Sequence, residues 1–199
     1  MVVFFIAGWS VYNRSRPIDL AGQQNTSGIT KLPTEVTIYP SDPVKGNQEA
    51  KVTIIEFGDF ACTYCAQAAV TLNKVLSEQV GQYELIWKDF PLPSHTQAMM
   101  AAEAAQCAAR QGKFWQYHDA LWRRQVDLKE ATLISIVGEV GIDLESFNRC
   151  LSSHETKPLI ELNIAEGKAL GVDGAPYFII NGQVIDGLIT EDQLRAFLE

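Results

Sequence analysis

The sequence is poor in positive charge. Its 199 residues hold 16 Lys and Arg against 24 Asp and Glu, which gives a net charge of −8, and no basic cluster is present. Nucleic-acid binding depends on neutralising phosphates, so this balance argues against general binding of DNA or RNA. Hydrophobic residues make up 47% of the chain. That is enough apolar surface to order one domain with a sizeable core, which excludes disorder over most of the length.

Long hydrophobic runs are also missing. Met1–Tyr12 is nearly all apolar, but a membrane-spanning helix needs about 20 such residues. The basic residues that precede the core of a secretory signal are absent before this run. We therefore interpret residues 1–12 as the remnant of a membrane anchor or a signal-like segment; an ordinary core strand is the alternative. Residues 13–35 are polar with scattered Gly, Ser and Pro, a composition typical of a linker.

Common nucleotide-binding and hydrolase motifs are absent. We find no Walker loop, dinucleotide fingerprint, serine nucleophile elbow or HExxH pattern. The three histidines, His95, His118 and His154, form no ligand pair, so we expect neither a metal nor an organic cofactor. His95 stands just before a helical pattern, where its side chain is expected to cap the helix or to pack; lining a substrate groove is the alternative.

Strand and helix patterns alternate along the rest of the chain. Val52–Phe57 (VTIIEF) and Tyr83–Lys88 (YELIWK) are predicted strands. Between them apolar residues recur with the helical period, and Gly81 is placed to end that helix. Further helical patterns follow, separated by Gly or Asp, over residues 98–111, 114–124, 128–140, 144–152 and 158–170.

The C-terminal segment adds two more strands and a last helix. Tyr177–Asn181 and Gln183–Asp186 are separated by Gly182, and Asn-Gly favours the type I′ turn of a hairpin. Thr190 with Gln193 is a capping-box pattern for a final helix. The order β-α-β, several helices, β-β-α predicts an α/β fold.

Two cysteines, Cys62 and Cys65, lie three residues apart at the first strand-to-helix junction. Unpaired N–H groups and the helix dipole favour an anion at a helix N-terminus. Such a position lowers a thiol pKa from about 8.5 to between about 3.5 and 7.5. Cys62 is therefore the predicted attacking or attacked sulfur, and Cys65, one turn further on the inward side, the resolving one. Half of a zinc site is the alternative, although no second ligand pair is present.

Glu56 stands inside the apolar strand, six residues before Cys62 and on the same strand face as Val52 and Ile54. Burial raises the pKa of a carboxyl group. A neutral Glu56 could exchange a proton with Cys65 while a disulfide opens or closes, which makes it a candidate catalytic residue. Alternatively, this strand face is partly solvated and Glu56 is a surface acid.

Four ordered motifs are similar to the DsbA-like branch of the thioredoxin superfamily: VTIIEFGDFACTYC, WKDFPLPSH, QGKFWQYHDALW and GVDGAPYFIING. The resemblance runs from Val36 to Leu198. It implies a thioredoxin fold, formed by residues 36–92 and 171–199, with an all-helical domain inserted over residues 93–170.

The resemblance also assigns site residues. It implies that Pro176 is the cis-proline facing the redox disulfide Cys62–Cys65, and that Ala175 offers its backbone to a substrate peptide. Thr63 and Tyr64 are implied to contact the substrate as well. They replace the Pro-His pair of strongly oxidising members, and family members more often carry Val or Thr in place of Ala175. These departures predict a milder oxidant.

The remaining two cysteines, Cys107 and Cys150, are isolated in the sequence. The resemblance implies a structural disulfide between them, as in some relatives; two buried free thiols are the alternative. Such a bridge would close a loop of 150 − 107 = 43 residues, worth roughly 3–4 kcal/mol. It would also indicate an oxidising compartment.

Together these observations predict a monomeric thiol:disulfide oxidoreductase, tethered by its N-terminus in the periplasm or at the outer face of the cell membrane. Its expected partners are reduced or misoxidised protein substrates and a membrane redox partner that resets the active site. We expect it to form disulfides in exported proteins. The alternatives are a disulfide reductase or isomerase, and a thiol-based peptide- or metal-binding assembly factor.

Overall fold

The structure is a computed structural model, which describes residues 16–19 and 35–199. The expected anchor remnant at residues 1–12 lies outside the described residues, and so does most of the expected linker. Inside that linker Arg16–Asp19 form strand β1, which pairs antiparallel with β2, Glu35–Ile38. In the described part of the chain, no helix has the length and apolarity needed to cross a membrane.

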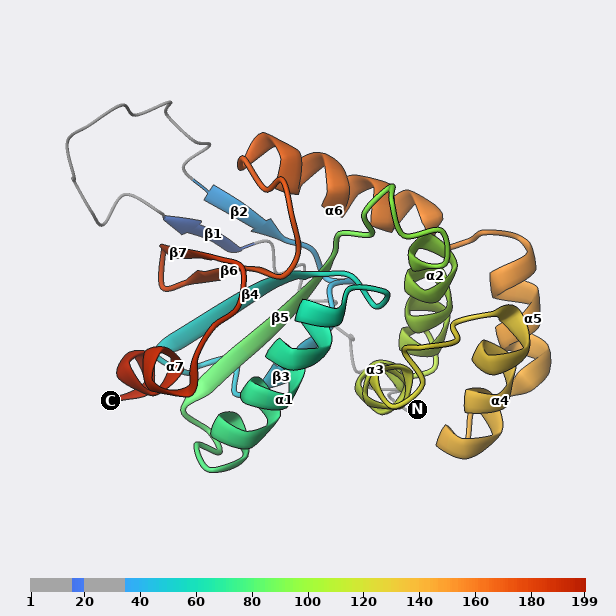
Figure 1. The fold of residues 1–199 in the computed structure, drawn as a ribbon, viewed down its shortest axis with the longest axis horizontal. Helices are drawn as coiled ribbons and strands as arrows, with labels where there is room; N and C mark the ends of the chain where they lie inside the picture. The colour runs from blue at the N-terminus through green and yellow to red at the C-terminus, as the bar shows by residue number, and fades with distance from the viewer. Residues whose placement is uncertain (1–15, 20–34) are drawn as a thin grey trace, which may run out of the picture.

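A five-stranded sheet forms the centre of the molecule, in the order β3-β5-β4-β6-β7 (Figure 1). The central strands β4 and β5 are parallel, and β3, β6 and β7 join antiparallel. Their bounds are β3 Val44–Gly46, β4 Val52–Gly58, β5 Tyr83–Asp89, β6 Tyr177–Ile180 and β7 Gln183–Asp186. Strands β4 to β7 are largely those predicted; β1, β2 and β3 are additional.

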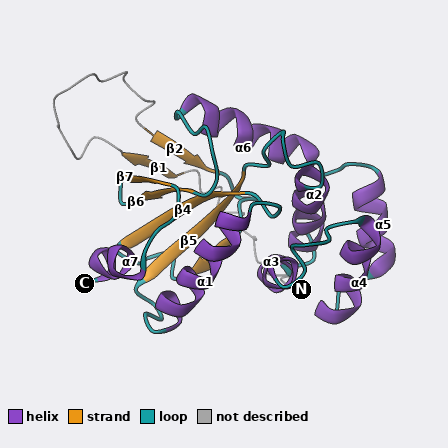
Figure 2. Cartoon of the chain, in the orientation of Figure 1, coloured by secondary structure: helices purple, strands orange, loops and turns teal. Residues whose placement is uncertain are grey.

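Helices cover both faces of this sheet (Figure 2). Helices α1, Thr63–Ser77, and α7, Glu191–Leu198, pack on the face that carries Ile54 and Phe178. The opposite face carries Ile55 and packs against the C-terminal part of α6, Lys157–Ala169, and the residues after it. The alternation of buried residues along β4 follows the period of a strand. The arrangement confirms the predicted α/β thioredoxin fold.

Four helices form a second compact unit beside the sheet (Figure 1). They are α2 Ala98–Ala109, α3 Phe114–Trp122, α4 Glu130–Val140 and α5 Leu144–Ser152. This helical unit has its own hydrophobic core, into which Phe60 and Trp87 of the sheet-bearing part extend. Because Phe60 lies in the loop before α1, the helical unit reaches the first strand-to-helix junction.

Helix α6 belongs to the segment expected as part of the helical insertion, yet it packs against the sheet. Gly167 allows the close approach, because a Cβ at this position would lie 2.8 Å from the ring of Phe90. The buried Lys88 of β5 adds an ion pair to Glu166 of α6 at 3.0 Å and another to Asp42 at 2.6 Å. These contacts depend on tertiary packing, so the helical period of α6 alone does not reveal them.

Local signals at the C-terminal end form as predicted. Asn181 and Gly182, between β6 and β7, both have positive φ, 47° and 82°, as a type I′ turn requires. Thr190 and Gln193 form the capping box of α7. The expectation for Gly81 was wrong, since α1 ends at Ser77 and Gly81 lies in the following turn.

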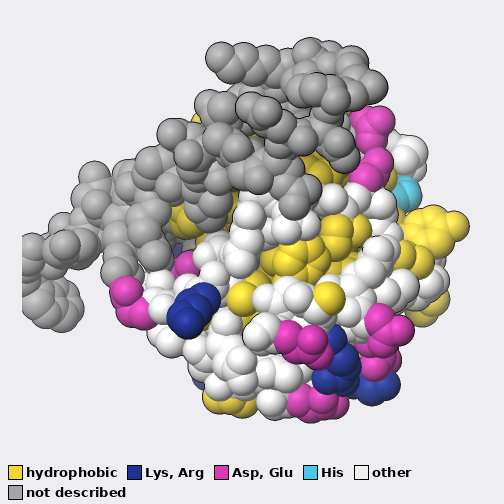
Figure 3. Space-filling model, turned by 90° about the vertical axis from the view of Figure 1, so that its left-hand side faces the viewer, with side chains coloured by type: hydrophobic (Ala, Val, Ile, Leu, Met, Phe, Trp, Pro, Cys, Tyr) yellow, Lys and Arg dark blue, Asp and Glu magenta, His cyan; other side chains and the backbone are white. Residues whose placement is uncertain are grey.

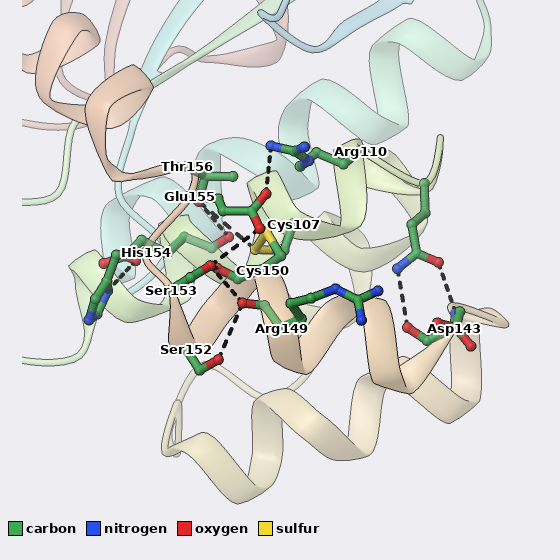
Figure 4. Close-up of a disulfide and its surroundings, with 12 residues drawn as sticks. Cys107, Arg110, Asp143, Arg149, Cys150, Ser152, Ser153, His154, Glu155 and Thr156 are labelled. Atoms are coloured by element: carbon green, nitrogen blue, oxygen red, sulfur yellow. Dashed lines mark hydrogen bonds and ion pairs between the residues drawn. A yellow bond between two sulfur atoms is a disulfide. The ribbon is translucent and has the colours of Figure 1, made fainter.

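Cys107 of α2 and Cys150 of α5, which stand 43 positions apart in the sequence, are joined by a disulfide (Figure 4). Beside the bridge, the carboxylate of Glu155 points toward the guanidinium of Arg110, at 3.0 Å. The disulfide and this ion pair both join α2 to the end of α5 and the turn after it. The other two cysteines of the chain are free.

Basic and acidic side chains lie next to one another on the face shown in Figure 3, with hydrophobic side chains exposed between them. Two ion pairs link α1 to the start and middle of α7: Lys74 to Glu191 at 2.6 Å and Arg195 to Glu78 at 2.8 Å. Both pairs are solvent-exposed, so each contributes little to stability.

Candidate active site

The two free cysteines lie where β4 leads into α1. Cys62 is the N-cap residue of α1, with extended backbone angles and no side-chain capping bond. Its sulfur therefore lies at the helix N-terminus, where the backbone N–H groups of Tyr64 and Cys65 stabilise its anion. Cys65 follows one turn later, fully buried against the sheet.

Cys62 and Cys65 lie 3.7 Å apart, and the pKa values of their thiols are shifted in opposite directions. A hydrogen bond from the thiol of Cys65 is the largest cause that lowers the pKa of Cys62 to about 6; burial opposes it. The pKa of Cys65 is raised, first by burial and then by its hydrogen bond to Cys62 and the charge of Glu56. Near neutral pH the pair therefore holds a thiolate at Cys62 and a thiol at Cys65.

Glu56 lies in the middle of β4, opposite Trp87 and Phe178 of the neighbouring strands. It is 2% exposed, which excludes the interpretation as a surface acid. Its Oε1 has no hydrogen-bond partner among the described residues, and burial raises its pKa to about 8. Glu56 therefore carries a proton near neutral pH, within electrostatic reach of Cys65.

The loop before β6 faces the cysteine pair. The Ala175–Pro176 peptide bond is cis, and the thiol form of Cys62 donates a hydrogen bond to the carbonyl oxygen of Ala175 at 3.2 Å. Thr63 and Tyr64 are exposed at the start of α1, Tyr64 to 58%. The structure thus brings together, at one end of the sheet, the residues that the sequence assigned to the site.

Three further residues hold the loop before Cys62. The carboxylate of Asp59 accepts hydrogen bonds from Ala61 N at 2.7 Å and from Leu92 N at 2.9 Å, and it lies 2.7 Å from Nδ1 of His95. Gln125 Nε2 donates to the carbonyl oxygens of Phe60 and Cys62, at 3.1 and 2.7 Å.

Sequence reasoning missed all three of these roles. Asp59 follows β4 directly, and a short acidic residue in a strand-to-helix loop is a local signal that could have indicated it. The ring of His95 bonds Asp59 instead of capping α2, whose N-cap residue is Gln97. Gln125 carries no local signal, because its partners lie about sixty residues away in sequence.

Metal ligation was the alternative for the cysteine pair. Within residues 35–199, the side chains of His, Cys, Asp and Glu form no group of three that could hold a metal ion.

This fold, with a pair of free cysteines where β4 leads into α1, is of the thioredoxin type. A family model described as "Thioredoxin" matches residues 39–199. A thioredoxin-like oxidoreductase from Silicibacter pomeroyi is 30% identical, with a TM-score of 0.73, over 79% of this chain and 90% of that one. The thiol-disulfide exchange protein alpha-DsbA2 from Wolbachia pipientis has the same TM-score at 22% identity, covering 80% and 86%. The chain belongs to the thioredoxin family.

The curated relatives are much longer proteins. The chain is 36% identical over 164 residues to a Na(+)/H(+) antiporter NhaA 3 of Salinispora tropica. The matched segment covers 80% of this chain and 25% of that protein. A Na(+)/H(+) antiporter NhaA of Herminiimonas arsenicoxydans is 29% identical over 203 residues, 31% of its length. The chain thus spans about a quarter to a third of these two relatives, and the likeness concerns that segment alone.

Proposed function

We propose that the protein forms disulfides in exported proteins by exchange through Cys62 and Cys65. A substrate thiolate attacks the sulfur of Cys62 in the oxidised protein, and the bond to Cys65 breaks. A second substrate thiolate then attacks the substrate sulfur of the mixed disulfide and expels Cys62 as a thiolate. The substrate loses two electrons and gains a disulfide, while the protein becomes a dithiol.

The observation that carries this proposal is the unequal acidity of the two cysteines. A thiol of low pKa is a good leaving group, and its thiolate stabilises the reduced protein. Because Cys62 has a pKa of about 6, the reduced form is favoured near neutral pH. A protein whose reduced form is stabilised draws electrons from its substrates, so it acts as an oxidant.

Glu56 is proposed as the proton donor to Cys65. When the disulfide opens, Cys65 leaves as a buried thiolate, and its raised pKa makes it take up a proton. The proton of Glu56 is available near neutral pH, because the pKa of Glu56 is about 8. The carboxylate left behind regains a proton from solvent.

The substrate is proposed to bind as an extended peptide beside Ala175, whose carbonyl oxygen faces Cys62 at 3.2 Å. Backbone hydrogen bonds to an added strand give affinity that depends little on sequence. Pro176 shapes this edge, and Thr63 and Tyr64 are exposed next to Cys62 in the sequence, at the start of α1. A broad range of unfolded protein substrates fits such a surface.

The location and the partners belong to the same proposal. The disulfide between Cys107 and Cys150 is of the kind that persists in oxidising compartments, which supports the periplasm or the outer face of the membrane. Each cycle leaves the protein reduced, so a membrane redox partner has to remove two electrons. We propose a monomer held near that partner by the N-terminal segment.

The reduction potential of the Cys62–Cys65 pair against glutathione tests the direction of the reaction. A disulfide-forming protein is expected well above the roughly −270 mV of thioredoxin. A value at or below that potential would instead support the alternative, a disulfide reductase or isomerase.

Two variants test the site itself. Cys62→Ser is expected to abolish oxidation of a reduced model protein, whereas Cys65→Ser should accumulate the mixed disulfide with Cys62. Retained exchange in Cys62→Ser would contradict the proposed function. Copper or zinc bound stoichiometrically through purification would favour the metal-binding assembly factor.

A further inference from the structure

The buried carboxylate of Asp59 and the half-buried imidazole of His95 lie 2.7 Å apart next to the cysteine motif, and the proposed reaction does not use them. We propose that Asp59 and His95 are positioning residues that together control how readily Cys62 becomes a thiolate. This inference rests on the proposed function, because it concerns the strength of the same site as an oxidant.

The backbone of Asp59 contacts both cysteines. Its carbonyl oxygen accepts a hydrogen bond from Cys62 N at 3.0 Å, and its N–H donates to the sulfur of Cys65 at 3.5 Å. Through its side chain the same residue holds Ala61, Leu92 and His95. A change in the charge or position of Asp59 therefore changes the hydrogen bonding and the electrostatic surroundings of both cysteines.

The side chain of Asp59 places a carboxylate close to the Cys62 sulfur. It is fully buried, so water screens its charge poorly, and that charge raises the pKa of Cys62. Asp59 thus opposes the helix N-terminus and the Cys65 thiol, which stabilise the thiolate. A compensating positive charge beside Asp59 would relieve this opposition.

His95 is placed to supply that charge. Its Nδ1 faces Asp59 at 2.7 Å, and its side chain is 30% exposed, so protons from solvent reach the ring. Imidazole changes charge in the physiological range of pH. Protonated His95 beside Asp59 forms a neutral pair, whereas neutral His95 leaves the carboxylate uncompensated.

Other charged groups also face His95 from the elements packed around it. His95 lines a cavity of about 450 Å³ together with Lys168 of α6 and Asp173 of the loop before β6. Lys168 and Asp173 carry opposite charges and are both exposed, so their fields partly cancel and are screened by water. Asp59 is the buried charge in direct contact with the ring.

The consequence is a redox equilibrium that depends on this pair. The reduced protein carries the Cys62 thiolate and the oxidised protein does not, so a group that stabilises the thiolate favours reduction. Proton uptake by His95 makes the protein a stronger oxidant relative to a variant without the imidazole. Loss of the Asp59 charge likewise makes the protein a stronger oxidant.

Two isosteric variants, Asp59→Asn and His95→Gln, test the proposal in the full chain. Thiolate formation is followed by ultraviolet absorbance in the reduced protein, and the redox equilibrium against glutathione over a series of pH values. Asp59→Asn is expected to lower the pKa of Cys62 by about half a unit, which is about threefold in the equilibrium constant. His95→Gln should shift both quantities the opposite way by a similar factor.

Two further variants distinguish an effect of charge from an effect of structural support of the loop. They are the double variant Asp59→Asn/His95→Gln and the single variant Gln125→Ala. With Asp59 replaced by Asn, the His95 substitution should lose most of its effect, because coupled groups are not additive. Gln125→Ala removes two hydrogen bonds from the same loop without changing a charge. It should alter the stability of the protein and leave the pH dependence of the glutathione equilibrium unchanged.

Equal shifts in one direction for Asp59→Asn and His95→Gln, or shifts that Gln125→Ala reproduces, would overturn the proposal. So would the absence of any shift in two folded variants. Glutathione equilibrium and thiolate absorbance need no protein substrate. A failure of the unmodified protein to oxidise a reduced protein would therefore count against the proposed function alone.

Discussion

At the scale of single residues, the chemistry depends on two identical side chains in different surroundings. Cys62 caps a helix and contacts backbone N–H groups, whereas Cys65 is buried one turn later above Glu56. Sequence spacing predicts the first position from the helix dipole alone. The strength of the effect comes from the Cys65 thiol, the largest cause of the lowered pKa of Cys62.

The titration of Cys62 gives a prediction with a definite sign. Alkylation of the reduced protein should follow a midpoint near pH 6, the value for the folded thiol, and not the roughly 8.5 of a free cysteine. Because folding lowers this pKa, the thiolate stabilises the reduced protein above the unfolded pKa, and this contribution is lost as the pH falls through 6. Denaturant unfolding of reduced and oxidised protein measures the difference; a reduced form that becomes relatively more stable toward acid would contradict it.

Glu56 titrates with the opposite sign. Burial raises its pKa from 4.5 to about 8. Between these pH values the unfolded chain loses the proton and the folded protein keeps it, so the free energy of unfolding falls as the pH rises. Glu56→Gln should therefore be more stable than the unmodified protein at alkaline pH and similar below pH 4.5. It should also slow exchange by about tenfold, because proton delivery to Cys65 is lost. Unchanged exchange kinetics would remove Glu56 from the mechanism.

At the scale of secondary-structure elements, a covalent link stabilises the helical unit. The bridge from Cys107 in α2 to Cys150 in α5 reduces the number of conformations available to the unfolded chain. Replacing both residues by Ser should lower the free energy of unfolding by roughly 3–4 kcal/mol, measured in urea. The glutathione equilibrium of the active site should stay the same, since neither residue contacts Cys62. A large shift of that equilibrium would show that the bridge acts on the site.

The packing of α6 shows what an element's own sequence leaves open. Its helical period predicts its bounds to within one residue. Its place on the sheet follows from Gly167 against Phe90 and from the ion pair of Glu166 with Lys88. Partners so far apart in sequence give no periodic signal.

At the scale of the whole molecule, the helical unit and the sheet meet at the redox motif. Phe60, in the loop between β4 and α1, stacks on Trp87 with ring centroids 4.9 Å apart, and its ring centroid lies 5.0 Å from that of Trp122 in α3. Gln125 adds hydrogen bonds to the carbonyl oxygens of Phe60 and Cys62. The helical unit therefore takes part in positioning the thiols.

Phe60→Ala tests this coupling. Phe60 is 1% exposed, and truncation of a buried aromatic side chain costs about 3–5 kcal/mol. We expect that loss of stability together with slower exchange, because the loop before Cys62 loses its anchor. Phe60→Leu, which keeps most of the volume, should restore the greater part of both. Normal exchange by a folded Phe60→Ala would show that the helical unit does not position the motif.

Local patterns in the sequence predict the local structure. They give the bounds of most strands and helices, the hairpin turn at Asn181, the capping box at Thr190 and the position of the cysteine motif at the start of a helix. These follow from periods, caps and turn residues that act within a few positions. Three features depend on the packing of segments that are distant in the sequence. Cys62 faces Ala175, 113 positions away, Glu56 is buried, and the ring of His95 bonds the carboxylate of Asp59. Burial and long-range hydrogen bonds arise when distant segments pack, and their strength depends on the low dielectric that packing creates.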